Sequence, residues 1–137
     1  MRLFDYDYIS SSGIGNRRMA NILIVDDSRT SRKILRNILE SAGHTIVGEA
    51  ANGEEGVKLY DELKPDLVTL DITMPVLDGI GALQRIKESH PTSKAIMVTA
   101  AGQKTKMVEA VKYGADEFIP KPFEPEKLVA VVGKVVG

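Results

Sequence analysis

One short apolar stretch limits the folds open to this chain more than any other part of it. Residues 66–71 read Asp-Leu-Val-Thr-Leu-Asp, with Pro65 before them and Pro75 four positions after Asp71. An apolar run of this length between turn-forming residues is typical of a strand buried on both faces of a parallel sheet. Asp71 would then end that strand, at the edge where open α/β sheets bind their ligands.

The pattern of a short apolar strand followed by an amphipathic helix recurs along the chain. We expect strands over 22–25, 45–50, 67–71, 94–99 and 117–119, and helices over 28–42, 52–63, 78–86, 102–114 and 124–136. Ser28 and Asn52 are suitable N-caps, and Gly43 and Gly114 are suitable helix ends. This alternation predicts an α/β fold, a five-stranded parallel sheet with helices on both faces and right-handed crossovers. The weaker strand 45–50 is expected at a sheet edge.

The composition excludes several classes of protein. Eighteen Lys and Arg nearly balance nineteen Asp and Glu, so no overall field favours nucleic acid or an anionic membrane. The absence of Cys excludes disulfides and thiolate metal sites. No apolar run approaches the ~20 residues that span a bilayer, and the first residues lack the pattern of a signal peptide. We therefore expect a soluble, cytoplasmic monomer that binds neither nucleic acid nor a membrane.

The first 18 residues differ in character from the rest. Residues 3–9 alternate apolar and acidic side chains, and residues 10–15 are rich in Ser and Gly. We interpret residues 1–18 as a flexible N-terminal extension; the alternative is a short strand that docks on another surface. We expect residues 19–137 to form one domain, with no room for a second before Gly137.

Polar residues stand at the ends of four of the expected strands: Asp26 with Asp27, then Asp71, Thr99 and Lys121. These strand ends meet at one edge of a parallel sheet, where three carboxylates repel unless a cation or shared protons relieve them. A hard divalent ion such as Mg²⁺ suits an all-oxygen site of this kind. Lys121 adds a point charge for a phosphoryl group, and the Thr99 hydroxyl adds a donor.

We expect the phosphoryl donor to be another protein or a small phosphorylated molecule rather than a nucleotide, because the chain has no G-x-x-x-x-G-K-[ST] motif and no G-x-G-x-x-G follows the first strand. Asp71 is the carboxylate available as the nucleophile that would form an aspartyl phosphate. Each residue also has an ordinary structural interpretation: Asp26 and Asp27 favour a helix N-terminus, Asp71 is compatible with a turn, and Lys121 with a solvated loop. Their joint occurrence at four strand ends favours the functional interpretation.

Other residues that could carry chemistry are given structural interpretations. His44 and His90 lie at helix-to-strand connections, and we expect both on the surface rather than as ligands. Met97 and Met107 are expected in the core. The helix over 102–114 has Met107, Val108, Ala110 and Val111 as its apolar residues.

From residue 21 onwards the chain resembles the response-regulator receiver domain. The motifs behind this resemblance are Ile-Leu-Ile-Val-Asp26-Asp27, Leu-Asp71-Ile-Thr-Met-Pro, Asp78-Gly79, Val-Thr99-Ala-Ala and Lys121-Pro122-Phe123. The resemblance implies a flavodoxin-like (βα)5 fold with strand order 2-1-3-4-5. It also implies that a histidine kinase donates the phosphoryl group to Asp71.

The resemblance further implies a role for each residue of the site. Asp27, Asp71 and the main-chain carbonyl of Thr73 would bind Mg²⁺, with Asp26 acting mainly through water. Lys121 would pair with the phosphoryl oxygens, and the Lys121-Pro122 bond would be cis. Thr99 and Phe118 would form the switch that responds to phosphorylation.

Within the family, the chain most resembles stand-alone chemotaxis regulators of the CheY type. The expected output surface comprises the helix over 102–114, the strand over 117–119 and the helix over 124–136, and it includes Lys106, Lys112, Tyr113, Phe118 and Lys127. Its expected partner is a flagellar motor switch protein, and small Ala100 and Ala101 leave the site open to a phosphatase. We expect no enzyme activity beyond the chain's own phosphorylation and dephosphorylation.

Two alternatives remain open at this point. A phosphorelay intermediate, or another stand-alone receiver without a link to motility, would carry the same motifs. A Mg²⁺-dependent phosphohydrolase is disfavoured, because Thr73 leaves no second carboxylate two residues after Asp71 to act as general acid.

Overall fold

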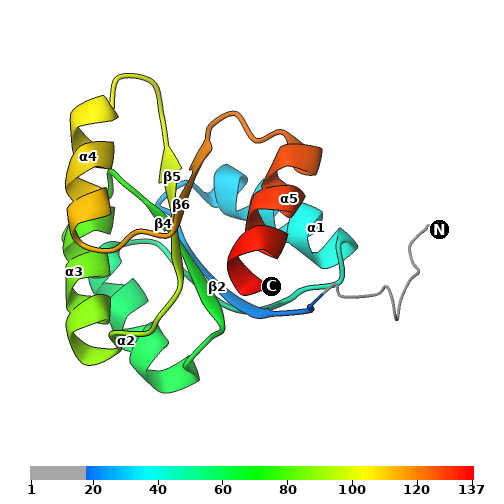
Figure 1. The fold of residues 1–137 in the computed structure, drawn as a ribbon, viewed down its shortest axis with the longest axis horizontal. Coiled ribbons are helices and arrows are strands. Elements are labelled where there is room, and N and C mark those ends of the chain that lie inside the picture. The colour runs from blue at the N-terminus through cyan, green and yellow to red at the C-terminus, as the bar shows by residue number, and fades with distance from the viewer. Residues whose placement is uncertain (1–17) are drawn as a thin grey trace.

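The structure is a computed structural model that describes residues 18–137. Within this range, five strands alternate with five helices (Figure 1). The strands are β2 (Asn21–Val25), β3 (Thr45–Ala50), β4 (Leu67–Asp71), β5 (Ala95–Thr99) and β6 (Glu117–Pro120). The helices are α1 (Arg29–Ser41), α2 (Gly53–Leu63), α3 (Gly79–Ser89), α4 (Lys104–Lys112) and α5 (Pro125–Val136). The expected extension over residues 1–18 lies, but for its last residue, outside the described part.

All pairs of neighbouring strands in the sheet are parallel, and the strand order is β3-β2-β4-β5-β6. Counted along residues 18–137 this is the order 2-1-3-4-5, so the expected fold is confirmed. Helices α1 and α5 cover one face, while α2, α3 and α4 cover the other (Figure 1). All five residues of β4 are buried in the centre of the sheet, and β3 lies at an edge as predicted.

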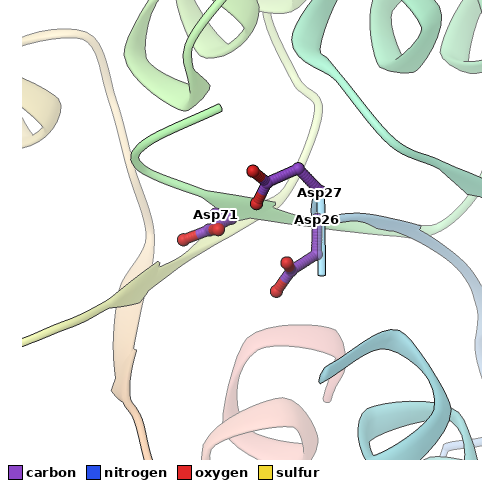
Figure 2. A group of neighbouring side chains, drawn as sticks. All are labelled: Asp26, Asp27 and Asp71. Atoms are coloured by element: carbon purple, nitrogen blue, oxygen red, sulfur yellow. The ribbon is translucent and has the colours of Figure 1, made fainter. Parts of the chain in front are cut away.

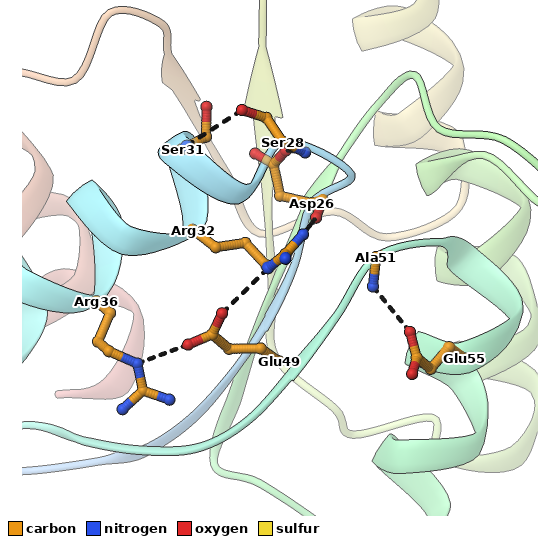
Figure 3. Close-up of polar contacts among 8 residues, drawn as sticks. All are labelled: Asp26, Ser28, Ser31, Arg32, Arg36, Glu49, Ala51 and Glu55. Carbon is orange, nitrogen blue, oxygen red and sulfur yellow. Dashed lines mark hydrogen bonds and ion pairs between the residues drawn. The ribbon is translucent and has the colours of Figure 1, made fainter.

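Short caps fix the turns between strands and helices. The side-chain oxygens of Ser28, Asn52 and Asp78 accept hydrogen bonds from the third backbone N–H that follows each of them, at 3.2, 2.8 and 2.8 Å. Glu55 also reaches back and accepts a hydrogen bond from Ala51 N at 2.9 Å (Figure 3). Because these caps satisfy otherwise unpaired helix donors, they define where α1, α2 and α3 begin after their strands.

The structure corrects the expectation for His44. Its side chain is buried, and Nδ1 accepts a hydrogen bond from Ala20 N at 3.0 Å, which ties the start of β2 to the turn before β3. His90 is partly buried, since it contacts Asp61 at 2.8 Å and its ring packs against Tyr60. Both histidines therefore stabilise connections far apart in sequence, which the local sequence could not reveal.

Helix α4 is more exposed than its composition suggests. Ala110 is fully buried and Met107 packs at the margin of the core, whereas Val108 and Val111 are 57% and 59% exposed. Only Met107 and Ala110 pack against the core, and the other two apolar residues of the helix face outwards. Met97, in β5, is fully buried as expected. No helix within residues 18–137 is long and apolar enough to span a bilayer.

Gly79, the first residue of α3, allows that helix to approach the end of β4. Gly79 N donates to Ile72 O at 2.8 Å. A Cβ atom at this position would lie 2.0 Å from the main-chain oxygen of Asp71. Only glycine permits this contact, so any larger residue must displace the backbone of Asp71 or of the helix.

We predict that Gly79→Ala lowers the free energy of unfolding by about 1–3 kcal/mol, because the added methyl group overpacks the end of β4. Urea denaturation measures the change. Gly133→Ala in α5 is the control, since a Cβ atom there meets nothing within 4 Å; it should leave stability unchanged or raise it. Equal effects of the two substitutions would contradict this explanation.

Candidate functional site

Three carboxylates gather where two neighbouring strands end. Asp26 and Asp27 follow β2 directly, and Asp71 is the last residue of β4. One oxygen from each lies within 4.8 Å of the others (Figure 2). Asp26 and Asp71 are buried, whereas Asp27 is exposed. The strand order thus brings together the three acids that the sequence placed at the same edge of the sheet.

Lys121 supplies a positive charge to this cluster from the loop between β6 and α5. Its Nζ lies 3.0 Å from Asp26 Oδ2 and 3.5 Å from Asp71 Oδ2. The Lys121-Pro122 bond is cis, and Lys121 N donates to Thr99 O at 2.7 Å. Burial alone would lower the pKa of Lys121, but the hydrogen bond and charge of Asp26, with those of Asp71, outweigh burial and raise it.

The environment makes Asp71 harder to ionise than an ordinary aspartate. Burial, followed by the charge of Asp26, raises the pKa of Asp71 to about 6. Asp27 adds to this rise, and Lys121 opposes it. A shifted carboxyl in a cluster of charged groups is characteristic of functional sites. Asp71 is nevertheless a carboxylate for the most part at neutral pH, and so is able to act as a nucleophile.

The remaining predicted residues lie around this cluster. Thr99 is the buried last residue of β5. Phe118 lies on β6, is paired with Met97 in the register of β5 with β6, and packs against the core below α3 and α4. Thr73 lies in the loop after β4 and is exposed; its hydroxyl accepts a hydrogen bond from Gln103 Nε2 at 2.8 Å. The predicted positions other than Phe118 therefore lie at or just beyond the carboxyl ends of β2, β4, β5 and β6, whereas Phe118 pairs with the middle of β5.

A network on α1 holds Asp26 in place, and the sequence did not reveal it. Arg32 Nη1 donates to the carbonyl of Asp26 at 2.6 Å, and its Nε donates to Glu49 on β3 at 3.0 Å (Figure 3). Arg36, one turn further along, donates to the other oxygen of Glu49 at 2.6 Å. Burial would raise the pKa of Glu49, but its hydrogen bonds with Arg36 and Arg32 outweigh this and lower it.

Asp26 is also held through its own side chain and amide. Its Oδ1 accepts from Ser28 N at 2.8 Å, and its N–H donates to Ala50 O at 3.0 Å. The sequence signal for the network around Glu49 was the pair Arg32 and Arg36, spaced four residues apart. Their partner on the edge strand could be identified only from the fold.

The donor set of the cluster fits a hard divalent cation. Carboxylate oxygens at this separation are the ligands that Mg²⁺ takes in proteins. Both oxygens of Asp26 have close partners, Lys121 Nζ at 3.0 Å and Ser28 N at 2.8 Å. Asp71 has the longer contact with Lys121, at 3.5 Å, and Asp27 is exposed, so all three acids are candidate ligands and Asp27 and Asp71 are the less engaged. Lys121 adds a cation suited to phosphate oxygens. The edge of the sheet can thus hold a cation and an anionic group side by side.

Comparison with known proteins is consistent with this geometry. The sequence profile of the response regulator receiver domain matches residues 22–133. The chemotaxis protein CheY of Thermotoga maritima is 47% identical over 114 residues, which cover 83% of this chain and 95% of that protein. Protein CcdB of Bacillus subtilis is 49% identical over 119 residues, which cover 87% of this chain and 99% of that protein.

A solved structure shows the same fold. The crystal structure of the CheX–CheY–BeF3–Mg²⁺ complex from Borrelia burgdorferi contains a chain 40% identical to this one, with a TM-score of 0.81. The match covers 85% of this chain and 89% of that chain.

We predict that Asp71→Asn stabilises the metal-free protein above about pH 6. The pKa of Asp71 rises from the ordinary 3.8 to about 6 on folding, so its ionisation lowers the free energy of unfolding as the pH rises between these values. The gain should be on the order of 1 kcal/mol, because water at the partly open site reduces both the cost of burying the charge and the repulsion from Asp26, and it should vanish below the ordinary pKa.

Urea denaturation as a function of pH measures this effect. Glu88→Gln removes an exposed carboxylate from α3 and is the control; its stability should follow that of the unmodified protein at every pH. If Asp71→Asn is no more stable than the unmodified protein at pH values above about 6, folding does not raise the pKa of Asp71.

Proposed function

Because the chain belongs to the response regulator receiver family, we propose that it accepts a phosphoryl group on Asp71 and signals through the change that follows. The observation that carries the proposal is the position of Asp71, a buried carboxylate at the end of the central strand, beside Asp27 and 3.5 Å from Lys121. We propose residues 19–137 as the receiver and residues 1–18 as an extension.

The proposed reaction is the transfer of a phosphoryl group from the phosphohistidine of a histidine kinase. An Asp71 carboxylate oxygen attacks phosphorus; the new O–P bond forms as the N–P bond breaks, and the imidazole keeps the electron pair. The raised pKa of about 6 still leaves Asp71 ionised at neutral pH. Lys121 balances charge on the phosphoryl oxygens, and the Thr99 hydroxyl offers them a hydrogen bond.

The cation partner of this site is proposed to be Mg²⁺. Asp27, Asp71 and the main-chain carbonyl of Thr73 would hold the ion, and Asp26 would act mainly through water. Bound there, Mg²⁺ supplies Lewis-acid stabilisation to the phosphoryl oxygens. The closeness of the three carboxylate oxygens supports this assignment.

The proposed output surface consists of α4, β6 and α5. Thr99 and Phe118 lie on the adjacent strands β5 and β6 and would change conformation together after phosphorylation. Val108 and Val111 on α4, and Tyr113 directly after it, expose apolar surface that a protein partner could cover. Lys106, Lys112 and Lys127 add positive charge to the same surface and would favour an acidic partner.

The proposed biological role is chemotaxis, with a flagellar motor switch protein as the target and a phosphatase as a further partner. Similarity to CheY proteins over nearly their whole length supports this role. The alternative is a phosphorelay intermediate or another receiver without a link to motility, and the relative named CcdB does not decide between them. Binding to a flagellar switch peptide, against transfer to a histidine-phosphotransfer domain, separates the two.

We further propose that the chain catalyses only its own phosphorylation and dephosphorylation. Thr73 stands where a phosphohydrolase of this design would need an acid, and its hydroxyl is bonded to Gln103. Multiple turnover on a panel of phosphoesters would contradict this proposal.

We predict that acetyl phosphate with Mg²⁺ adds one phosphoryl group to the protein and none to Asp71→Asn. Intact-mass spectrometry measures the addition, and chelation of Mg²⁺ should abolish it. Asp66→Asn is a matched control at the opposite end of β4, and it should be phosphorylated like the unmodified protein. Equal phosphorylation of Asp71→Asn would exclude Asp71 as the acceptor.

We predict that Thr73 and Ala101 set the lifetime of phosphorylated Asp71, because each lies two residues beyond a strand end at the site and is exposed. Ala101→Gln should accelerate loss of the phosphoryl group, since a carboxamide can orient water towards phosphorus. The decay of the added mass after removal of acetyl phosphate measures the rate. Ala101→Val is the control, and equal lifetimes for the two variants would count against this prediction.

A further inference from the structure

Gln103 links the two loops that border the carboxylate cluster. Its Oε1 accepts a hydrogen bond from Ala100 N at 2.7 Å, and its Nε2 donates to Thr73 Oγ1 at 2.8 Å. Thr73 lies two residues after Asp71, and Ala100 directly follows Thr99. One carboxamide therefore bridges the loops after β4 and β5.

The direction of the Ala100 N–H follows from the strand register. Val98 faces β4, because its carbonyl accepts from Ile72 N at 3.2 Å, whereas the carbonyl of Thr99 faces β6 and accepts from Lys121 N. Successive residues of a central parallel strand face opposite neighbours. By continuation of this alternation beyond Thr99, the Ala100 N–H is directed to the β4 side of β5, the side of Asp71, which pairs with Val98 in the sheet.

We propose that the Gln103 side chain occupies, in the unphosphorylated protein, the main-chain donor that a phosphoryl oxygen on Asp71 takes over. This inference rests on the proposed phosphorylation of Asp71. A charged phosphoryl oxygen is a stronger acceptor than a carboxamide oxygen, so it displaces Gln103 from Ala100 N. Gln103 is thus a positioning residue that opposes phosphorylation.

The displacement also acts on the output surface. Gln103 immediately precedes α4, and its carbonyl accepts a hydrogen bond from Met107 N at 3.0 Å in the first turn of that helix. While the side chain is bonded to Thr73 and Ala100, the start of α4 is tied to the site. Once the carboxamide leaves Ala100 N, one of these two bonds is lost and the first turn of α4 is held less firmly, in addition to any change of Thr99 and Phe118.

The test is the affinity for beryllofluoride, a phosphoryl mimic, in the presence of Mg²⁺. Titration followed by amide resonances gives the dissociation constant and reports on Ala100 and α4 separately. Gln103→Ala should bind about two- to tenfold more tightly than the unmodified protein, since the mimic no longer competes for one hydrogen bond. Gln103→Asn keeps the carboxamide but shortens its reach, and should behave like Gln103→Ala.

Two further variants distinguish displacement from a general structural effect. Gln84→Ala removes an exposed glutamine from α3 and should leave the affinity unchanged. Thr73→Ala removes the second contact of Gln103 while keeping the main-chain carbonyl. Combined with Gln103→Ala, it should add less than the sum of the separate effects, because both act on one carboxamide. The Ala100 amide resonance of free Gln103→Ala should also shift.

Tighter binding by the Gln103 variants with a shifted Ala100 resonance supports the inference. Unchanged or weaker binding, while the unmodified protein binds the mimic, overturns it and leaves the proposed phosphorylation intact. Failure of the unmodified protein to bind the mimic overturns the inference together with the proposed function.

Discussion

The repulsion among three carboxylates at one edge of the sheet is the constraint on which the rest of the site depends. Asp26, Asp27 and Asp71 are held close by two adjacent parallel strands, and two of them are buried. Lys121 offsets part of the repulsion from the loop after β6. Because one lysine faces three acids, the cluster retains excess negative charge, which would favour binding of a divalent cation.

Contacts from the surrounding helices and loops hold the residues of the cluster in place. Arg32 holds the carbonyl of Asp26 from α1, and Gly79 lets α3 press against the main chain of Asp71. Gln103, just before α4, forms hydrogen bonds to both the loop after β4 and the loop after β5. Helices on both faces of the sheet thus contact the site, so a change in its charge can reach α4 through contacts that already exist.

The sequence predicted the parts of this molecule that depend on local pattern. The apolar run before Asp71 predicted a buried strand, and the strand ends predicted where the carboxylates would meet. The sequence did not predict polar contacts between residues far apart in the chain. His44 is buried and accepts a hydrogen bond from Ala20 N, and Arg32 on α1 donates to Glu49 on β3. Composition alone also could not show that Val108 faces outwards, since this depends on how α4 lies on the sheet.

We propose that this carboxylate cluster binds a cation and that Asp71 is one of its ligands. Calorimetric titration of Mg²⁺ into the protein, below and above the raised pKa of Asp71 at about 6, tests it most directly. We expect one Mg²⁺ per chain, bound more weakly and with release of a proton at the lower pH, because Asp71 must lose its proton to act as a ligand. Absence of Mg²⁺ binding, or equal binding at both pH values, would contradict the proposal that Asp71 is a ligand of the cation.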